Sequence, residues 1–297
     1  MTITAKSYNP VMPRSDLQAF VETMIPIMLE AGVFAAAQQG RVENIGKELD
    51  GLNPADTEYV KQRDRAKTVI DEQVQEKLLT AARAALRGTS VRLDAEEDTP
   101  SVKLFTASDA EVTLVIDPID GTLQYLKGSE LYSVCVALVS GGTMLAAIAY
   151  FPKWEKLYVL DEDRKPYVCQ YKNGERISRE ELRPPAALTG RTIFANHRVP
   201  RQECLAAQFE VIDDKDGSVT WTESFFRCMD GTYQAVLLAG PQVRDLLPGA
   251  LIQAMPGGYA VDFDGKPISW PDGGRVNGII FGFGEVPQSI LDCLKGV

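Results

Sequence analysis

The segment VTLVIDPIDGT, residues 112–122, constrains the fold more than any other part of the sequence. Its apolar run ends in Asp-Pro-Ile-Asp-Gly-Thr, the pattern of a buried strand that breaks into a turn. Pro118 removes a backbone N–H from the sheet, and Gly121 permits an unusual φ and the close approach of a ligand. We therefore expect Asp117 and Asp120 to sit at a rigid strand end, facing one crevice.

Two carboxylates this close repel each other, so one stays protonated unless a divalent cation neutralises the pair. Oxygen ligands suit Mg²⁺ better than zinc or copper, and the only histidine, His197, cannot build a His-rich zinc site alone. The alternative for this segment is a turn with two solvated aspartates, since Asp, Pro and Gly are common turn formers.

A second acidic cluster, residues 95–98, ends another short strand pattern upstream of the first. Adjacent residues on a strand point to opposite faces, so only one of Glu96 and Glu97 can face the metals. Alone, this cluster also fits a solvated acidic loop. Together, the two clusters predict a Mg²⁺ site lined by carboxylates.

Charge narrows the choice of partners. The net charge is −10 and the pI is near 4.8, so nucleic acid and anionic membranes are repelled. An anionic substrate therefore requires recruited cations, and metal ions would supply them. With 45% hydrophobic and 24% charged residues, the 297-residue chain is typical of a globular protein, which excludes disorder and fibrous repeats.

Neither a membrane span nor a signal peptide is predicted, because no stretch approaches about 18 consecutive apolar residues and the N-terminus lacks a basic-then-apolar order. The five cysteines are dispersed and form no CxxC pair. An odd, scattered set predicts reduced thiols and a cytoplasmic location.

Helices are expected over residues 15–40 and 56–87, followed by short strands and, from residue 131, an antiparallel meander. A new cycle of strands and helices starts at residue 191. The stretch around Pro184 and Pro185 is the best junction, which divides the chain into residues 1–185, an α+β half with the metal motifs, and residues 186–297, an α/β half. We expect the site between the halves.

The order of these motifs resembles the inositol monophosphatase superfamily of Mg²⁺-dependent, lithium-sensitive phosphomonoesterases. Its pattern is an Asp in an early helix, then EE, then DP(I/L)DGT, then WDxxAG near the C-terminus. Asp71 takes the first place, Glu96-Glu97 the second, and residues 117–122 match the third unchanged. Residues 244–249, RDLLPG, match the last motif loosely but keep Asp245. The resemblance implies a layered αβαβα sandwich of α/β class, and relatives are often homodimers.

The resemblance also implies a set of metal ligands. Glu96, Asp117 and the Ile119 carbonyl would hold a first Mg²⁺, while Asp117, Asp120 and Asp245 would hold a second. Glu96 would also border a weaker third site. Two or three Mg²⁺ ions are therefore expected.

The remaining matched residues would handle water and phosphate. Thr122, with Glu96, would orient the attacking water, and Asp71 would brace Thr122. The amides of Gly121 and Thr122 would bind the substrate phosphate, while Glu97 would support the ligands from behind. In a two-metal site one ion activates water and the other stabilises the leaving oxygen, so no protein nucleophile is needed.

The function expected is Mg²⁺-dependent hydrolysis of a phosphate monoester on a small polyol or sugar, a small phosphorylated metabolite. A 3′(2′),5′-bisphosphate nucleotide or histidinol phosphate is the alternative substrate, because the motifs do not separate these. Haloacid-dehalogenase-like phosphatases place their two aspartates two residues apart, whereas Asp117 and Asp120 are three apart. A metal- or ligand-binding protein without turnover also stays open, because Arg244, Leu247 and Pro248 alter the last motif.

Arg244 is a candidate substrate-binding residue, since a guanidinium suits a second phosphate or carboxylate on the substrate. The alternative is an Arg paired with a neighbouring acid. His197 is expected to be a structural or rim residue rather than a catalyst.

Overall fold

Strand β2 (Val112–Asp120), which carries the aspartate motif, lies inside a seven-stranded sheet in this computed structural model, which describes residues 12–47 and 56–296. The strands of this first sheet follow in chain order, with β1 parallel to β2 and every later pair antiparallel. The meander predicted from residue 131 is therefore present. The other strands are β1 (Val91–Ala95), β3 (Ser133–Ser140), β4 (Thr143–Phe151), β5 (Lys156–Leu160), β6 (Pro166–Lys172) and β7 (Glu175–Glu181).

The second sheet has five strands in the order β11-β12-β10-β8-β9. Strands β8, β9 and β10 are parallel, and β12 runs antiparallel to both of its neighbours. Their bounds are β8 (Thr192–Ala195), β9 (Glu210–Ile212), β10 (Ala235–Ala239), β11 (Gly258–Val261) and β12 (Gly278–Phe283).

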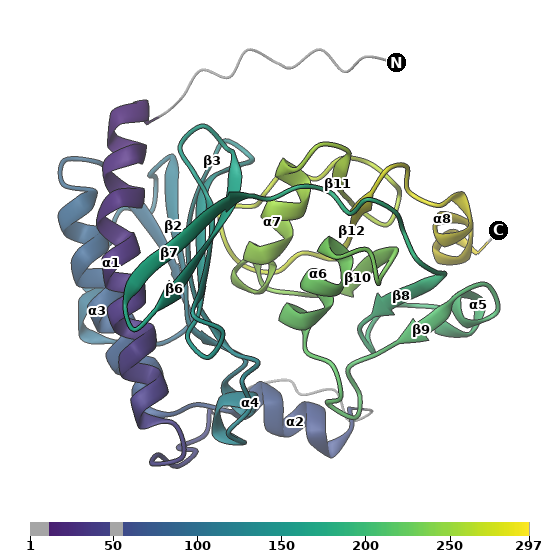
Figure 1. The fold of residues 1–297 in the computed structure, drawn as a ribbon, viewed down its shortest axis with the longest axis horizontal. Helices are drawn as coiled ribbons and strands as arrows, with labels where there is room; N and C mark the ends of the chain where they lie inside the picture. Colours follow the sequence, from purple (N-terminus) through teal and green to yellow (C-terminus); the bar gives the residue numbers. More distant parts are fainter. Residues whose placement is uncertain (1–11, 48–55, 297) are drawn as a thin grey trace.

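Helices and sheets alternate in five layers, as Figure 1 shows from left to right. The outer helices α1 and α3 cover the first sheet, α6 and α7 lie between the sheets, and α5 and α8 cover the second sheet. The predicted layered αβαβα sandwich is confirmed. The helix bounds are α1 (Arg14–Gln38), α2 (Glu58–Arg65), α3 (Val69–Ala85), α4 (Thr122–Leu126), α5 (Gln202–Ala206), α6 (Trp221–Met229), α7 (Leu247–Ala254) and α8 (Gln288–Lys295), with 3-10 turns η1 (Pro100–Leu104) and η2 (Val243–Leu246).

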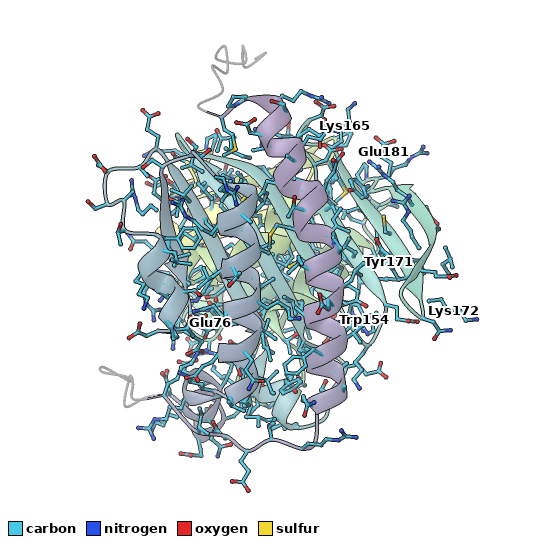
Figure 2. All side chains as sticks on the ribbon, turned by 90° about the vertical axis from the view of Figure 1, so that its left-hand side faces the viewer. Glu76, Trp154, Lys165, Tyr171, Lys172 and Glu181 are labelled. Carbon is cyan, nitrogen blue, oxygen red and sulfur yellow. A yellow bond between two sulfur atoms is a disulfide. The ribbon has the colours of Figure 1, made fainter. Side chains whose placement is uncertain are left out.

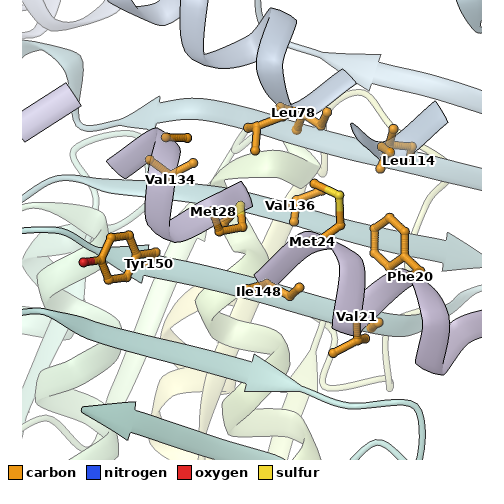
Figure 3. Packing of buried hydrophobic residues seen from close by; sticks show 14 of the residues in the cluster. Phe20, Val21, Met24, Met28, Leu78, Leu114, Val134, Val136, Ile148 and Tyr150 are labelled. Carbon is orange, nitrogen blue, oxygen red and sulfur yellow. The ribbon is translucent and has the colours of Figure 1, made fainter. Parts of the chain in front are cut away.

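Helix α1 forms because its apolar residues recur at helical spacing and bury one face against the sheet. Phe20, Met24 and Met28 of this face meet Val136 and Ile148 of the sheet (Figure 3). Figure 2 shows α1 and α3 side by side across the sheet. By length and composition α1 is the one helix in the described part of the chain that is apolar enough to cross a membrane; here it packs as a core helix.

The single helix predicted over residues 56–87 is wrong, because the chain is extended between α2 and α3. Ala66 ends α2 with a ψ of 130°, and Thr68 caps α3 with its hydroxyl accepting from the Ile70 amide. Asp71 accepts from the Thr68 amide in return, completing a capping box. A new helix therefore starts here, with Asp71 fixed in its first turn.

The two sheets share one buried core. Val115 and Cys135 of the first sheet pack in the same cluster as Phe281 of the second, with α6 and α7 between them. Strand β7 ends at Glu181 and β8 begins at Thr192, so the predicted boundary at 185/186 falls in the connection between the sheets.

The prediction that all five cysteines are reduced is wrong for one pair. Cys204 of α5 and Cys293 of α8 form a disulfide that joins positions 89 residues apart. Cys135, Cys169 and Cys228 are free and buried. The disulfide forms because both helices cover the same face of the second sheet, a proximity that only the tertiary fold creates.

Candidate active site and metal centre

The end of β2 builds the centre of the site. The pairing of β2 with β3 shifts its register between Asp117 and Asp120, where Pro118 interrupts the ladder. Gly121 then adopts a φ of 90° and begins α4. A side chain at Gly121 would lie 2.9 Å from the Leu131 carbonyl oxygen, so this turn requires glycine.

One pocket collects the predicted site residues from distant parts of the chain. Strand β1 is followed by Glu96, β2 supplies the aspartates, and η2 supplies the last motif. Asp71 does not line the pocket but lies directly behind it. The predicted residues that line it are Glu96, Asp117, Ile119, Asp120, Gly121, Thr122, Arg244 and Asp245.

Asp71 and Thr122 are joined as predicted. The Thr122 hydroxyl lies 3.0 Å from Asp71 Oδ1 and 3.0 Å from the Ile119 carbonyl oxygen, so its proton is directed away from the pocket. The other carboxylate oxygen of Asp71 accepts from the Thr68 hydroxyl at 2.6 Å. The lone pairs of Thr122 are left to accept a hydrogen bond from a water in the pocket.

Burial raises the pKa of three carboxyl groups in the pocket. The pKa of Asp117 lies well above its ordinary value, because burial and the negative charges of Glu96, Asp120 and Asp245 all disfavour its ionisation. Burial raises the pKa of Asp120 to about 7, although a hydrogen bond from Thr222 acts to lower it. Burial likewise raises the pKa of Asp245 to about 6, although the positive charge of Arg244 acts to lower it.

Glu96 differs from these three groups. Burial would raise the pKa of its carboxyl group, but the positive charges of Lys47 and Arg244 outweigh it and hold the pKa below its ordinary value. Lys47 Nζ lies against Glu96 and 2.9 Å from Glu97 Oε1. The carboxylates of the pocket thus require positive charge to ionise together, and Lys47 and Arg244 already provide part of it.

The donor set fits a hard divalent cation. Asp117 Oδ1 is buried and has no hydrogen-bond partner among the described residues, so it is an oxygen ligand without a proton donor. Carboxylates and a carbonyl are the ligands that Mg²⁺ prefers. As they stand, no three Asp, Glu, His or Cys side chains in the described ranges are close enough to chelate an ion together.

Only one glutamate of the pair faces the pocket, as expected. Glu97 is 5% exposed and lies outside the lining, where Lys67 contacts its carboxylate at 2.9 Å. Its amide donates to Gln75 Oε1 at 2.9 Å, which fixes the turn that presents Glu96. Glu97 therefore supports the site from behind.

Arg244 and His197 are both engaged with acids. Arg244 Nη1 lies 3.3 Å from Asp94 Oδ1, the alternative named for it above, although it also lines the pocket. His197 is nearly buried, with Nδ1 2.9 Å from Asp214 Oδ1 and Nε2 3.2 Å from Asp56 Oδ1. Its ring connects the segment before α2 to the second half of the chain.

A model of the inositol monophosphatase family matches residues 29–280. The chain belongs to this family. It is 30% identical over 154 residues to a protein named Nus factor SuhB from Xylella fastidiosa, which covers 51% of this chain and 55% of that protein. It is 27% identical over 144 residues to an inositol-1-monophosphatase from Rhizobium meliloti, covering 48% and 47%. The chain thus spans about half the length of these curated relatives.

Solved structures of the family share the fold over nearly the whole chain. An IMPase/NADP phosphatase complexed with Mg²⁺ and phosphate superposes with a TM-score of 0.67 at 18% identity, covering 93% of this chain and 95% of that one. At this identity the likeness establishes the fold. The sequence-based assignment to the inositol monophosphatase superfamily is confirmed.

Several residues of this inositol monophosphatase family site lie outside the motifs described above. Thr222, near the start of α6, donates a hydrogen bond to Asp120 Oδ2, and Ser133 lies 3.3 Å from the same oxygen. One wall of the pocket comes from α2, the loop after β8, the start of α6 and the segment around residue 275. These wall residues are Tyr59, Arg63, Asp64, Arg198, Thr220, Trp221 and Arg275.

Proposed function

We propose that the chain is a Mg²⁺-dependent phosphatase that hydrolyses a phosphate monoester of a small polyol or sugar with an activated water. The observation that carries the proposal is the buried, partnerless Asp117 Oδ1 within a pocket that also holds Glu96, Asp120 and Asp245. Family membership supports it.

The proposed ligands are Glu96, Asp117 and the Ile119 carbonyl for one ion, and Asp117, Asp120 and Asp245 for a second. When bound, Mg²⁺ would lower the pKa of water and neutralise the phosphate oxygens. Two ions are expected, with a weaker third site bordered by Glu96.

Thr122 orients the water in this proposal. Its proton is committed to Asp71 or the Ile119 carbonyl, so its oxygen accepts from the water and directs a water lone pair toward the phosphorus. The Gly121 and Thr122 amides lie at the start of α4, where backbone N–H groups have no partner within the helix. They bind the phosphate in the proposed complex.

A nucleotide 3′-phosphate is the second candidate substrate, because Tyr59 and Trp221 line the same pocket and aromatic rings stack on bases. Histidinol phosphate is a further member of the panel. We also propose that lithium inhibits the enzyme, that the chain forms a homodimer and that the protein is cytoplasmic. The disulfide argues against the cytoplasmic location, since such bonds persist mainly in oxidising compartments.

The test is release of phosphate from inositol, sugar, nucleotide and histidinol phosphates with Mg²⁺, with EDTA and with Li⁺. Asp117→Asn should abolish turnover, while Asp109→Asn, which alters an exposed carboxylate outside the pocket, should not. Turnover that survives EDTA or Asp117→Asn would refute the mechanism. Mg²⁺ binding without turnover of any substrate would favour a family member that only binds ligands.

A further inference from the structure

The charges that line the pocket are balanced among the described residues. Five acidic and five basic side chains face it, so the lining is formally neutral before any ion binds. Two Mg²⁺ ions would add four positive charges, whereas a phosphate monoester carries a charge of about −2 at most near neutral pH. Glu97, Asp94 and Asp214, which pair with basic residues of the lining from outside it, compensate part of the difference. The acidic members are Asp64, Glu96, Asp117, Asp120 and Asp245, and the basic members are Lys47, Arg63, Arg198, Arg244 and Arg275.

Four of the five basic side chains already have carboxylate partners. Lys47 contacts Glu96 and Glu97. Arg244 lies 3.3 Å from Asp94. The remaining two basic residues contact acids near α2. Arg63 lies 2.6 Å from Asp214 and 3.1 Å from Asp64, and Arg198 lies 2.8 Å from Asp64.

Arg275 has no carboxylate within ion-pair distance in the part of the chain that the structure describes. Its Nη1 donates to the Gly240 carbonyl oxygen at 2.7 Å. Gln242, with its amide oriented to satisfy both neighbours, accepts from Arg275 Nε at 3.3 Å. Both acceptors are neutral, so they orient the guanidinium group without neutralising its charge, and the exposed side chain keeps its other N–H donors in contact with solvent.

The backbone fixes Arg275 relative to the metal ligands. Gln242 and Arg275 form an antiparallel bridge, flanked by hydrogen bonds from the Val243 amide to the Gly274 carbonyl (2.8 Å) and from the Val276 amide to the Pro241 carbonyl (2.9 Å). The backbone N–H of Gln242 in turn donates a hydrogen bond to Asp245 Oδ2 at 2.7 Å. Arg275 is thus tied, through one residue, to a proposed Mg²⁺ ligand.

We propose that Arg275 binds a second anionic group, a phosphate or a carboxylate, on the part of the substrate that leaves as the alcohol. This inference rests on the proposed phosphatase function and narrows its substrate class to small phosphate esters with two anionic groups. A guanidinium group held by neutral acceptors keeps N–H donors for such a group. Arg275 thus takes the role that the sequence suggests for Arg244, because the guanidinium group of Arg244 is paired with Asp94.

Matched pairs of substrates test the proposal, each differing by one anionic group. The pairs are fructose 1-phosphate with fructose 1,6-bisphosphate, glucitol 6-phosphate with 6-phosphogluconate, and adenosine 3′-phosphate with adenosine 3′,5′-bisphosphate. For the preferred pair, Arg275→Ala should raise KM of the two-anion member about 10- to 100-fold, the effect of losing a charge-assisted hydrogen bond, and that of its partner much less. The pair affected distinguishes a phosphate from a carboxylate.

Two further variants complete the kinetic test. Arg275→Lys keeps the charge but not the planar donor pair, so it should recover part of the lost affinity. Arg83→Ala, which removes an exposed arginine of α3 outside the pocket, should leave both KM values at the wild-type level. Equal effects of Arg275→Ala on both members of every pair, or none on any, would overturn the proposal.

A binding measurement separates this inference from the proposed function. If no pair is hydrolysed, the phosphatase proposal fails, but calorimetric titration of each pair with Mg²⁺ present still decides the role of Arg275. Wild-type protein should bind a two-anion probe more tightly than its partner, and Arg275→Ala should remove that difference. Equal binding of both members by wild-type protein would rule out the second-anion site.

Discussion

The Thr222 hydroxyl donates a hydrogen bond to the Asp120 carboxylate. The contact joins α6, between the sheets, to the end of β2 in the first sheet. Thr222 is 5% exposed, and Ser133 approaches the same Asp120 oxygen from β3. Two hydroxyl groups therefore hold Asp120 Oδ2, which orients the other oxygen of this proposed ligand.

Replacing Thr222 should weaken metal binding before it affects the fold. Thr222→Val keeps the shape but removes the donor, and loss of a group that orients a ligand lowers metal affinity about 10- to 100-fold. Thr222→Ser keeps the hydroxyl and should bind Mg²⁺ nearly as wild type. Calorimetric titration with Mg²⁺ measures both, and equal dissociation constants for the Val variant and wild type would show that the hydrogen bond is dispensable.

The hydrogen bond between Asp71 and Thr122 predicts a shared kinetic defect. Thr122→Val removes the acceptor for the water, and Asp71→Asn removes the group that fixes the Thr122 proton. Each change should lower kcat about 10²-fold or more with a smaller effect on KM. Because the residues act as a unit, the double variant should be little worse than Thr122→Val alone. Multiplied effects in the double variant would mean that the two residues act independently.

Metal-free protein should lose stability as pH rises from about 4 to about 7. Burial raises the pKa of Asp120 to about 7 and that of Asp245 to about 6, and Asp117 shifts in the same direction. The folded state therefore holds protons that the unfolded state releases, so each group favours folding at low pH and opposes it once ionised. Each pKa unit corresponds to about 1.4 kcal/mol.

Thermal unfolding in EDTA, compared at pH 5.5 and pH 8, measures this effect. Asp117→Asn, which cannot ionise, should reduce the loss of Tm between the two values. Mg²⁺ should restore stability most at pH 8, because the ligands must be deprotonated to bind it. A Tm in EDTA that rises over this interval would contradict the assigned burial of these carboxyl groups.

The disulfide between Cys204 and Cys293 should be measurable by thiol counting. Denatured protein prepared without reductant should expose three thiols, and five after reduction. Breaking the bond, by Cys204→Ser with Cys293→Ser, should lower the free energy of unfolding by about 2–4 kcal/mol, with phosphate release unaffected since neither residue lines the pocket. Five reactive thiols before reduction would show that the bond is not formed in the isolated protein.

The parts of the site that could be predicted are those with local chemical signatures. Residues 117–122 predict a strand that ends in a glycine turn, and the structure has that turn at Gly121. The pairing of Asp71 with Thr122 was implied by family resemblance and is present at 3.0 Å. The break between α2 and α3 could also have been predicted. Thr68 and Asp71 have the spacing of a capping box, which marks the start of a new helix.

The rest of the site could not be predicted, because its residues meet only in the folded chain. Trp221 and Arg275 lie far from the motifs in sequence and belong to patterns that fit any surface segment. Arg244 could be placed near the ligands, but its partner Asp94 depends on how β1 meets the second half of the chain. The Cys204–Cys293 pair has the same origin, since spacing alone does not reveal which helices will share a face.

Strand β2 is buried on both faces, with Leu114 and Ile116 in the outer core and Val115 in the core between the sheets. The aspartates proposed to bind Mg²⁺ are thus anchored in a strand whose close packing tolerates little change in side-chain volume. The wall that would meet the remainder of a substrate stands instead on the short helix α2, the start of α6 and the turn at Arg275. Substitutions in this wall can therefore change which substrate binds without altering the residues proposed to carry out hydrolysis. The same hydrolytic core can in this way be adapted to different phosphorylated metabolites.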